Sequence, residues 1–79
     1  MADIRIPKVG MSAVEVEIID IPVKLGQKVV PGDPVADVGA DKADITIESD
    51  IRGVVMEVLA SPGDVCEVGQ VIVRVEEQQ

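Results

Sequence analysis

The 79-residue chain contains no Phe, Tyr, Trp or His and only one cysteine. The missing histidines exclude imidazole acid–base catalysis and histidine-containing metal sites, and the missing aromatic residues exclude stacking platforms for nucleic-acid bases. A single cysteine, Cys66, cannot form an internal disulfide, and its apolar strand context predicts a small core residue rather than a reactive thiol. No apolar run approaches the length of a membrane span, and no targeting segment is recognisable. An enzyme built from this chain alone would lack most catalytic groups.

Basic residues are also scarce, with 7 Lys and Arg against 15 Asp and Glu, so that the net charge is −8. Binding to nucleic-acid backbones or to anionic membranes requires the opposite sign, so we expect neither kind of partner. Two interpretations of the acidic surface remain open: it only keeps the domain soluble, or it meets basic partner surfaces and sets encounter rates. The acids concerned are Glu15, Glu17, Asp37, Asp44, Glu48 and Asp50.

The apolar residues that are present are mostly β-branched, with 16 Val and 9 Ile against 2 Leu. Such side chains are stiff at χ1 and suit a pleated surface better than a helix. Five prolines and seven glycines interrupt the chain at short intervals, which is typical of short strands joined by turns. The pattern predicts strands over residues 3–6, 15–21, 28–30, 34–39, 43–48, 53–58, 64–67 and 71–75.

Eight short strands at this spacing predict an all-β fold, a flattened β-barrel or sandwich of two four-stranded antiparallel sheets. A faint internal repeat predicts that two halves are related by a pseudo-two-fold axis. A shift of 37 residues places Gly26 on Gly63, Gly32 on Gly69, Val35 on Ile72 and Val38 on Val75. We expect one domain over residues 1–76, with residues 77–79 as the start of a linker or a frayed end.

The segment around Lys42 carries the most specific pattern. If Asp41 and Lys42 form a two-residue hairpin loop, one register places nearly all apolar side chains inward and nearly all polar ones outward. The inward pairs are Ala40/Ala43, Val38/Ile45 and Ala36/Ile47, and the outward pairs are Gly39/Asp44, Asp37/Thr46 and Val35/Glu48. A slip by one residue would bury the acids, so the register is well specified. The two-fold repeat places this turn at the opposite end of the domain from both termini.

Residues 35–49, with the sequence VADVGADKADITIES, resemble the lipoylation hairpin of lipoyl domains from 2-oxo acid dehydrogenase complexes. The signature of that hairpin is Asp-Lys-Ala, which here is Asp41-Lys42-Ala43. Residues 6–12, 26–29, 51–55 and 62–65 are similar to other turns and strands of the family, so the resemblance spans about residues 3–76. The chain departs from the family at Gly39-Ala40, where Glu-Thr or Glu-Ser is usual, and at Val16 and Ile21, where Gly and Trp are common.

The resemblance implies a non-catalytic carrier domain, the N-terminal part of a dihydrolipoyl acyltransferase. Lipoate would be attached by an amide bond to Lys42, with Asp41 and Ala43 shaping the turn for a lipoyl ligase or lipoyl transferase. The arm would shuttle acyl groups and reducing equivalents between a thiamine-diphosphate decarboxylase, the acyltransferase core and dihydrolipoyl dehydrogenase. By the same resemblance, a partner-recognition loop near the lysine consists of Gly10, Met11, Ser12, Ala13 and Val14.

Other interpretations of Lys42 remain open at this point. Without the resemblance it is most simply a solvated turn lysine, as Lys24 and Lys28 are expected to be. A biotinyl carrier shares the architecture but has Met-Lys-Met at its attachment site, and an unmodified barrel-sandwich adaptor needs no lysine there. We expect the isolated domain to be monomeric. Its expected location is the cytoplasm of a bacterium or archaeon, or the mitochondrial matrix if the chain is a processed eukaryotic fragment.

Overall fold

The computed structural model describes residues 1–8, 15–40 and 43–78. These residues form eight strands, each within two residues of its predicted ends. Because β-branched residues dominate and Gly or Pro interrupts every longer stretch, the strands are short. They are β1 (Ala2–Arg5), β2 (Glu15–Asp20), β3 (Lys28–Val29), β4 (Pro34–Ala40), β5 (Ala43–Glu48), β6 (Gly53–Val58), β7 (Val65–Glu67) and β8 (Val71–Glu77).

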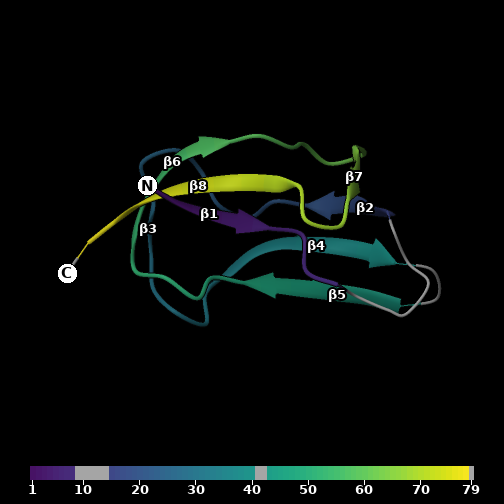
Figure 1. The fold of residues 1–79 in the computed structure, drawn as a ribbon, viewed down its shortest axis with the longest axis horizontal. Helices are drawn as coiled ribbons and strands as arrows, with labels where there is room; N and C mark the ends of the chain where they lie inside the picture. The colour runs from purple at the N-terminus through teal and green to yellow at the C-terminus, as the bar shows by residue number, and fades with distance from the viewer. Residues whose placement is uncertain (9–14, 41–42, 79) are drawn as a thin grey trace.

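The strands form two four-stranded antiparallel sheets that pack face to face (Figure 1). Sheet A has the order β1-β8-β6-β3, and sheet B has the order β5-β4-β2-β7. The prediction of an all-β fold with two four-stranded sheets is therefore confirmed. Sequential strands alternate between the sheets, except that β4 and β5 are hydrogen-bonded neighbours in sheet B. The β4–β5 hairpin is thus the direct link between the two halves of the chain.

The pseudo-two-fold repeat is also confirmed. Replacing β1–β4 by β5–β8, and the reverse, converts the strand order of sheet A into that of sheet B. The turns obey the same relation: Gly26 and Gly63, 37 residues apart, have φ angles of 82° and 94°. Glycine adopts this left-handed conformation without steric cost. Their amides donate to the carbonyl oxygens of Val55 and Ile18, both at 2.8 Å, and those acceptors are themselves 37 residues apart.

The two halves differ in the connection between their first two strands. Nine residues separate Arg5 from Glu15, whereas four separate Glu48 from Gly53. The offset between equivalent residues is therefore larger for the first strand of each half than for the other three. Cross-strand pairing identifies the equivalents: Thr46 lies opposite Asp37 in sheet B, as Asp3 lies opposite Arg74 in sheet A.

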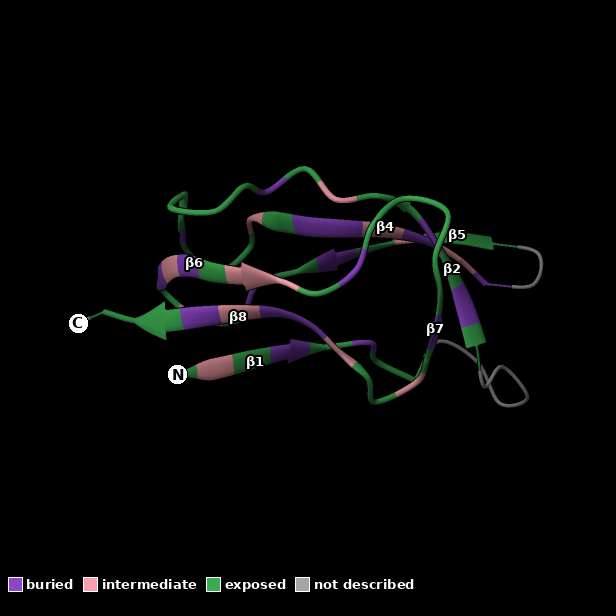
Figure 2. Ribbon diagram, turned by 90° about the horizontal axis from the view of Figure 1, so that it is seen from above, coloured by how far each residue is buried: buried purple, intermediate pink, exposed green. Residues whose placement is uncertain are grey.

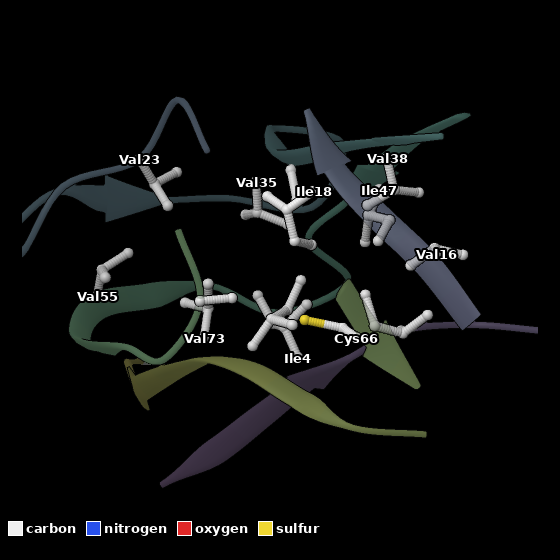
Figure 3. Close-up of a cluster of buried hydrophobic side chains, with 14 of the residues drawn as sticks. Ile4, Val16, Ile18, Val23, Val35, Val38, Ile47, Val55, Cys66 and Val73 are labelled. Atoms are coloured by element: carbon white, nitrogen blue, oxygen red, sulfur yellow. The ribbon is translucent and has the colours of Figure 1, made fainter. Parts of the chain in front are cut away.

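The core lies between the sheets, and buried residues alternate with exposed ones along the strands (Figure 2). The inward side chains of both layers point toward one another (Figure 3). In β2, for example, Val16 and Ile18 are buried between exposed glutamates. Removing a Val or Ile side chain from water contributes about 1.5–3 kcal/mol, so this layer supplies most of the stability. The largest fully buried side chains are Ile6, Ile18, Ile72, Val29, Val35, Val38, Val55, Val73, Val75 and Cys66.

The predicted outward position of Val35 is wrong. Pro34, not Val35, lies opposite Glu48, and Ala36 lies opposite Ile47, so β4 contains a bulge between them. The extra residue changes the side-chain alternation, and both Val35 and Ala36 are completely buried. The equivalent bulge in β8 contains Ile72, which is also completely buried.

Regular structure also extends past the predicted domain boundary at residue 76. Glu77 pairs with Gly53 as the last residue of β8, and the amide of Gln78 donates to the carbonyl oxygen of Arg52 at 2.9 Å.

Candidate functional site

The β4–β5 hairpin has the register that the sequence predicts over its outer half. Five consecutive pairs run from Ala36 opposite Ile47 to Ala40 opposite Ala43. In the sequence, only Asp41 and Lys42 stand between Ala40 and Ala43, and these two residues lie outside the described part of the chain. Ala43 is exposed, whereas Ala40 is buried in the core. Both residues lie on the inward face, so the start of β5 is accessible while the end of β4 is anchored in the core.

This hairpin end and the chain termini lie at opposite ends of the molecule (Figure 1). β1 starts and β8 ends at one pole, whereas β4 ends and β5 begins at the other. The principal extents of the fold are 36, 21 and 17 Å, so the two poles are separated along its longest dimension. A group attached at the hairpin end therefore lies far from both chain termini.

The structure places some of the predicted site residues and leaves others undescribed. Ala43 begins β5 at the hairpin end. Lys42, Asp41 and the predicted partner loop, Gly10, Met11, Ser12, Ala13 and Val14, lie outside the described residues. Glu15, which follows that loop in sequence, is nevertheless located. Glu17 lies opposite Gly39, so Glu15 stands two residues further toward the hairpin end. β2 therefore begins at the same pole as the hairpin end.

Polar contacts stiffen the hairpin at its middle and base. The Thr46 hydroxyl donates to the Asp37 carboxylate across the strands at 2.8 Å. At the base, buried Ser49 donates from its hydroxyl to the Ile51 carbonyl oxygen at 2.7 Å and accepts from the Ile51 amide at 3.1 Å. Within the described residues no buried side-chain nitrogen or oxygen lacks a hydrogen-bond partner. The hairpin is thus a rigid support.

One surface residue near the hairpin end was not predicted. Ile19 is the extra residue of a bulge in β2 and is 47% exposed. Its Cδ1 lies 3.5 Å from where a Cβ on Gly39 would stand, as does an Asp44 carboxylate oxygen. The available signal was the Ile18-Ile19 pair, which interrupts the alternation of residues 15–18. An isoleucine is therefore displayed on the outer surface of sheet B beside the hairpin.

The titratable groups of the described residues lie on the surface, apart from the thiol of Cys66. No group of three His, Cys, Asp or Glu among them could hold a metal ion, and no helix among them could cross a membrane. Burial, together with the nearby Asp64 carboxylate, raises the pKa of the Cys66 thiol and keeps it in its unreactive protonated form. A shallow groove of about 450 Å³ between β1 and β5 is bordered by Asp3, Arg5, Glu48 and Asp50.

Comparison with known proteins shows to which family the chain belongs. The model of a family described as biotin-requiring enzymes, the biotin/lipoyl family, matches residues 2–75. The chain belongs to this family. A curated relative, the lipoamide acyltransferase component of a branched-chain alpha-keto acid dehydrogenase complex from Pseudomonas putida, is 36% identical over 92% of the chain. The succinyltransferase component of a 2-oxoglutarate dehydrogenase complex from Staphylococcus saprophyticus is 32% identical over 98%.

The chain of this biotin/lipoyl-family domain spans only 17% and 18% of the length of those two relatives. The lipoyl domain of the 2-oxoglutarate dehydrogenase complex from Azotobacter vinelandii superposes on the whole chain with a TM-score of 0.80. Its sequence identity is 22% over the full length of both chains, so this likeness shows the shared fold. The resemblance found in the sequence to lipoyl domains is therefore confirmed at the level of the family and of the fold.

Proposed function

We propose that the domain is a lipoyl carrier in which Lys42 is the attachment residue. The observation that carries the proposal is the pairing of Ala40 with Ala43, which leaves only Asp41 and Lys42 to connect two rigid strands. Support also comes from the relatives, which are acyltransferase components of 2-oxo acid dehydrogenase complexes. The proposed recognition residues are Asp41 and Ala43 at the turn and residues 10–14 before β2.

The described residues fit a covalently attached arm. Such an arm needs an accessible lysine on a firm support, and at the hairpin end β5 begins with two exposed residues while β4 ends on the buried Ala40. A lipoyl group in amide linkage to Lys42 would supply a dithiolane that accepts an acyl group and two electrons and passes both on. β4 and β5 hold the attachment point away from the chain termini, and the proposed acyl transfer takes place on the arm.

The proposed partners follow from this role. They are the lipoyl ligase or transferase, a thiamine-diphosphate decarboxylase, the acyltransferase core and dihydrolipoyl dehydrogenase. The domain's own contribution is tethering, because linkage to the core turns bimolecular encounters into an effective concentration of about the millimolar range. The proposed carrier is monomeric as an isolated domain. Its proposed location is the cytoplasm, or the mitochondrial matrix for a processed eukaryotic chain.

Intact mass spectrometry tests the attachment site. Expression with lipoate and a lipoyl ligase is expected to add the mass of one lipoyl group to the wild type and nothing to Lys42→Arg. Lys24→Arg and Lys28→Arg are matched controls, because both replace exposed lysines of the same domain and are expected to be fully modified. Modification that persists in Lys42→Arg and disappears in either control would refute the assignment.

The family description also names biotin, so biotinylation is a second candidate. The residues flanking Lys42 are Asp41 and Ala43 rather than methionines, which favours lipoate. Parallel incubation with a biotin ligase and biotin is expected to leave the mass unchanged. A mass gain equal to one biotinyl group on Lys42, without any gain from lipoate, would reverse the cofactor assignment.

A further inference from the structure

The two sheets carry very different charges on their outer surfaces. The strands of sheet B contain seven acidic residues and no Lys or Arg. Those of sheet A contain four acidic and three basic residues. The outer surface of sheet B is called the acidic face below. Its residues are Glu15, Glu17, Asp20, Asp37, Asp44, Glu48 and Glu67, together with the exposed Ile19 and Val65.

The pseudo-two-fold axis shows that the difference does not come from the backbone. Residues equivalent to the three cations of sheet A are acidic or apolar in sheet B: Arg74 corresponds to Asp37, Arg5 to Glu48 and Lys28 to Val65. Within the described residues every ion pair lies on sheet A, where Arg74 contacts Asp3 at 3.5 Å and Glu57 at 3.3 Å. At the positions of Arg5 and Arg74, sheet A therefore carries paired charge, whereas sheet B carries negative charge without a cation beside it in the described part of the chain.

The acidic face also contains cross-strand pairs that oppose folding. Asp20 lies directly opposite Asp37, and Glu15 lies directly opposite Glu67. Like charges placed directly opposite one another destabilise a sheet, whereas solubility requires only that charges be exposed. The arrangement is therefore costly for the isolated domain, and a basic partner surface would relieve it.

Position and composition connect the acidic face with the attachment site. Asp44 and Glu15 lie toward the hairpin end, and Ile19 packs over Gly39 between them and the middle of the sheet. Exposed apolar side chains inside a charged rim are typical of a protein interface. Attachment through the Lys42 amine would remove the cation that is nearest in sequence to this face. The modified domain would then present a purely negative face next to its arm.

We propose that the acidic face docks on a basic surface of the thiamine-diphosphate decarboxylase, beside the entrance through which the Lys42 arm passes. This inference rests on the proposed carrier function. Charge complementarity selects a basic surface, and continuity with the hairpin end requires that surface to border the partner's active-site entrance. The acyltransferase core is reached through the tether, which already supplies a high effective concentration. The decarboxylase is a separate component that begins the cycle, so it gains most from electrostatic attraction.

An NMR titration locates the docking surface without depending on the arm. The ¹⁵N-labelled, unmodified domain is titrated at low salt with the decarboxylase of the same organism that acylates the wild-type domain. Amides of β2, β4 and β5 are expected to shift or broaden, and those of β1, β6 and β8 are not. Perturbation centred on sheet A would overturn the assignment of the face. The titration is repeated with the lipoyl ligase and with dihydrolipoyl dehydrogenase. If one of these proteins perturbs sheet B and the decarboxylase does not, the assignment of the partner is overturned.

Two matched triple variants separate the acidic face from net charge. Glu15→Gln/Glu17→Gln/Asp44→Asn neutralises the face, and Glu57→Gln/Glu76→Gln/Glu77→Gln neutralises three acids of sheet A. Each changes the net charge of the unmodified chain from −8 to −5. At low salt the first variant is expected to lower kcat/KM for reductive acylation about tenfold, and the second less than about twofold. The loss is expected to shrink toward twofold at about 0.5 M salt, because salt screens exposed charges.

Equal losses in the two triple variants, or no loss in either, would overturn the inference. Intact mass distinguishes a failure of the docking proposal from a failure of the carrier function, since both variants are expected to be fully lipoylated. If the wild type gains no lipoyl group, the proposed function fails. If all three proteins are lipoylated and acylated at equal rates, only the docking face is wrong.

Discussion

Sheet A and sheet B are the same backbone arrangement used twice, with different surfaces. Their interiors match: Ile4 of β1 and Ile47 of β5 occupy equivalent positions and are 5% and 6% exposed. Their exteriors do not match, because sheet A holds four of its seven charged residues in ion pairs, whereas the carboxylates of sheet B have no ion-pair partner among the described residues. Apolar burial therefore accounts for the repeated fold, whereas the outer side chains make one face different from the other. The hairpin that contains Lys42 belongs to sheet B, the sheet without ion pairs among the described residues.

The largest expected difference between the sheets concerns close backbone packing. A Cβ on Gly53 of sheet A would overlap the carbonyl oxygen of Glu76 and lie 2.6 Å from a methyl carbon of Val75. Backbone cannot yield as a side chain can, so Gly53→Ala is expected to lower the free energy of unfolding by about 3 kcal/mol. On sheet B, a Cβ on Gly39 meets its nearest atoms at 3.5 Å, so Gly39→Ala is the control and should change stability by less than about 1 kcal/mol.

Urea denaturation followed by circular dichroism measures both glycine variants. Equal stability of Gly53→Ala and Gly39→Ala would mean that β6 and β8 are not packed as closely as the structure shows. A large loss in Gly39→Ala would instead contradict the ordinary van der Waals spacing between a Cβ at this position and its neighbours Ile19 and Asp44.

The difference between the outer surfaces predicts opposite signs for two equivalent substitutions. Asp20 and Glu57 correspond by the 37-residue shift, but Asp20 lies opposite Asp37 whereas Glu57 contacts Arg74 at 3.3 Å. Asp20→Asn removes a repulsion and is expected to stabilise the domain by about 0.2–1 kcal/mol at low salt. Glu57→Gln removes an ion pair whose side chains are 42% and 43% exposed, so a loss of about 0.2–1 kcal/mol is expected.

Chemical denaturation at low and high salt checks this pair of variants. Each substitution removes one negative charge from the same chain, so an effect of net charge would shift the two unfolding free energies in the same direction. Two changes of the same sign would therefore contradict the contrast between the sheets. Both effects are expected to decrease at about 1 M salt, where the Debye length is about 3 Å.

The sequence was sufficient to predict the sheets where alternation is strict, and insufficient where a bulge changes it. Ala36 to Ala40 alternate cleanly against residues 43–47, so the register followed from patterning alone. Val35 was misplaced because a bulge adds a residue without any mark in a Val-Ala run, whereas the bulge at Ile19 left a signal in the Ile18-Ile19 pair. The attachment lysine followed from the family signature. The acidic residues of β2, β4 and β5 were visible in sequence, but only strand pairing shows that Asp20 faces Asp37.

The smallest expected difference lies in the core. Cys66 of β7 and Val29 of β3 are equivalent, and both are buried, at 1% and 0% exposure. Burial raises the pKa of the Cys66 thiol above that of an unfolded chain. The folded state therefore keeps its proton when the unfolded state begins to lose it, at about pH 8.5. The stability linked to this group is complete below that pH and is lost as the pH rises through the folded-state pKa.

Cys66→Val tests this linkage by copying the residue of the equivalent strand. Between about pH 8 and pH 10, the unfolding free energy of the wild type is expected to fall more steeply than that of Cys66→Val. The comparison uses the slopes and not the absolute stabilities, because a valine also changes core packing. Lysine titration is common to both proteins and cancels. Parallel slopes would show that the thiol titrates in the same way in the folded and unfolded states. Position 66 would then match the equivalent Val29 in its response to pH as well as in its burial.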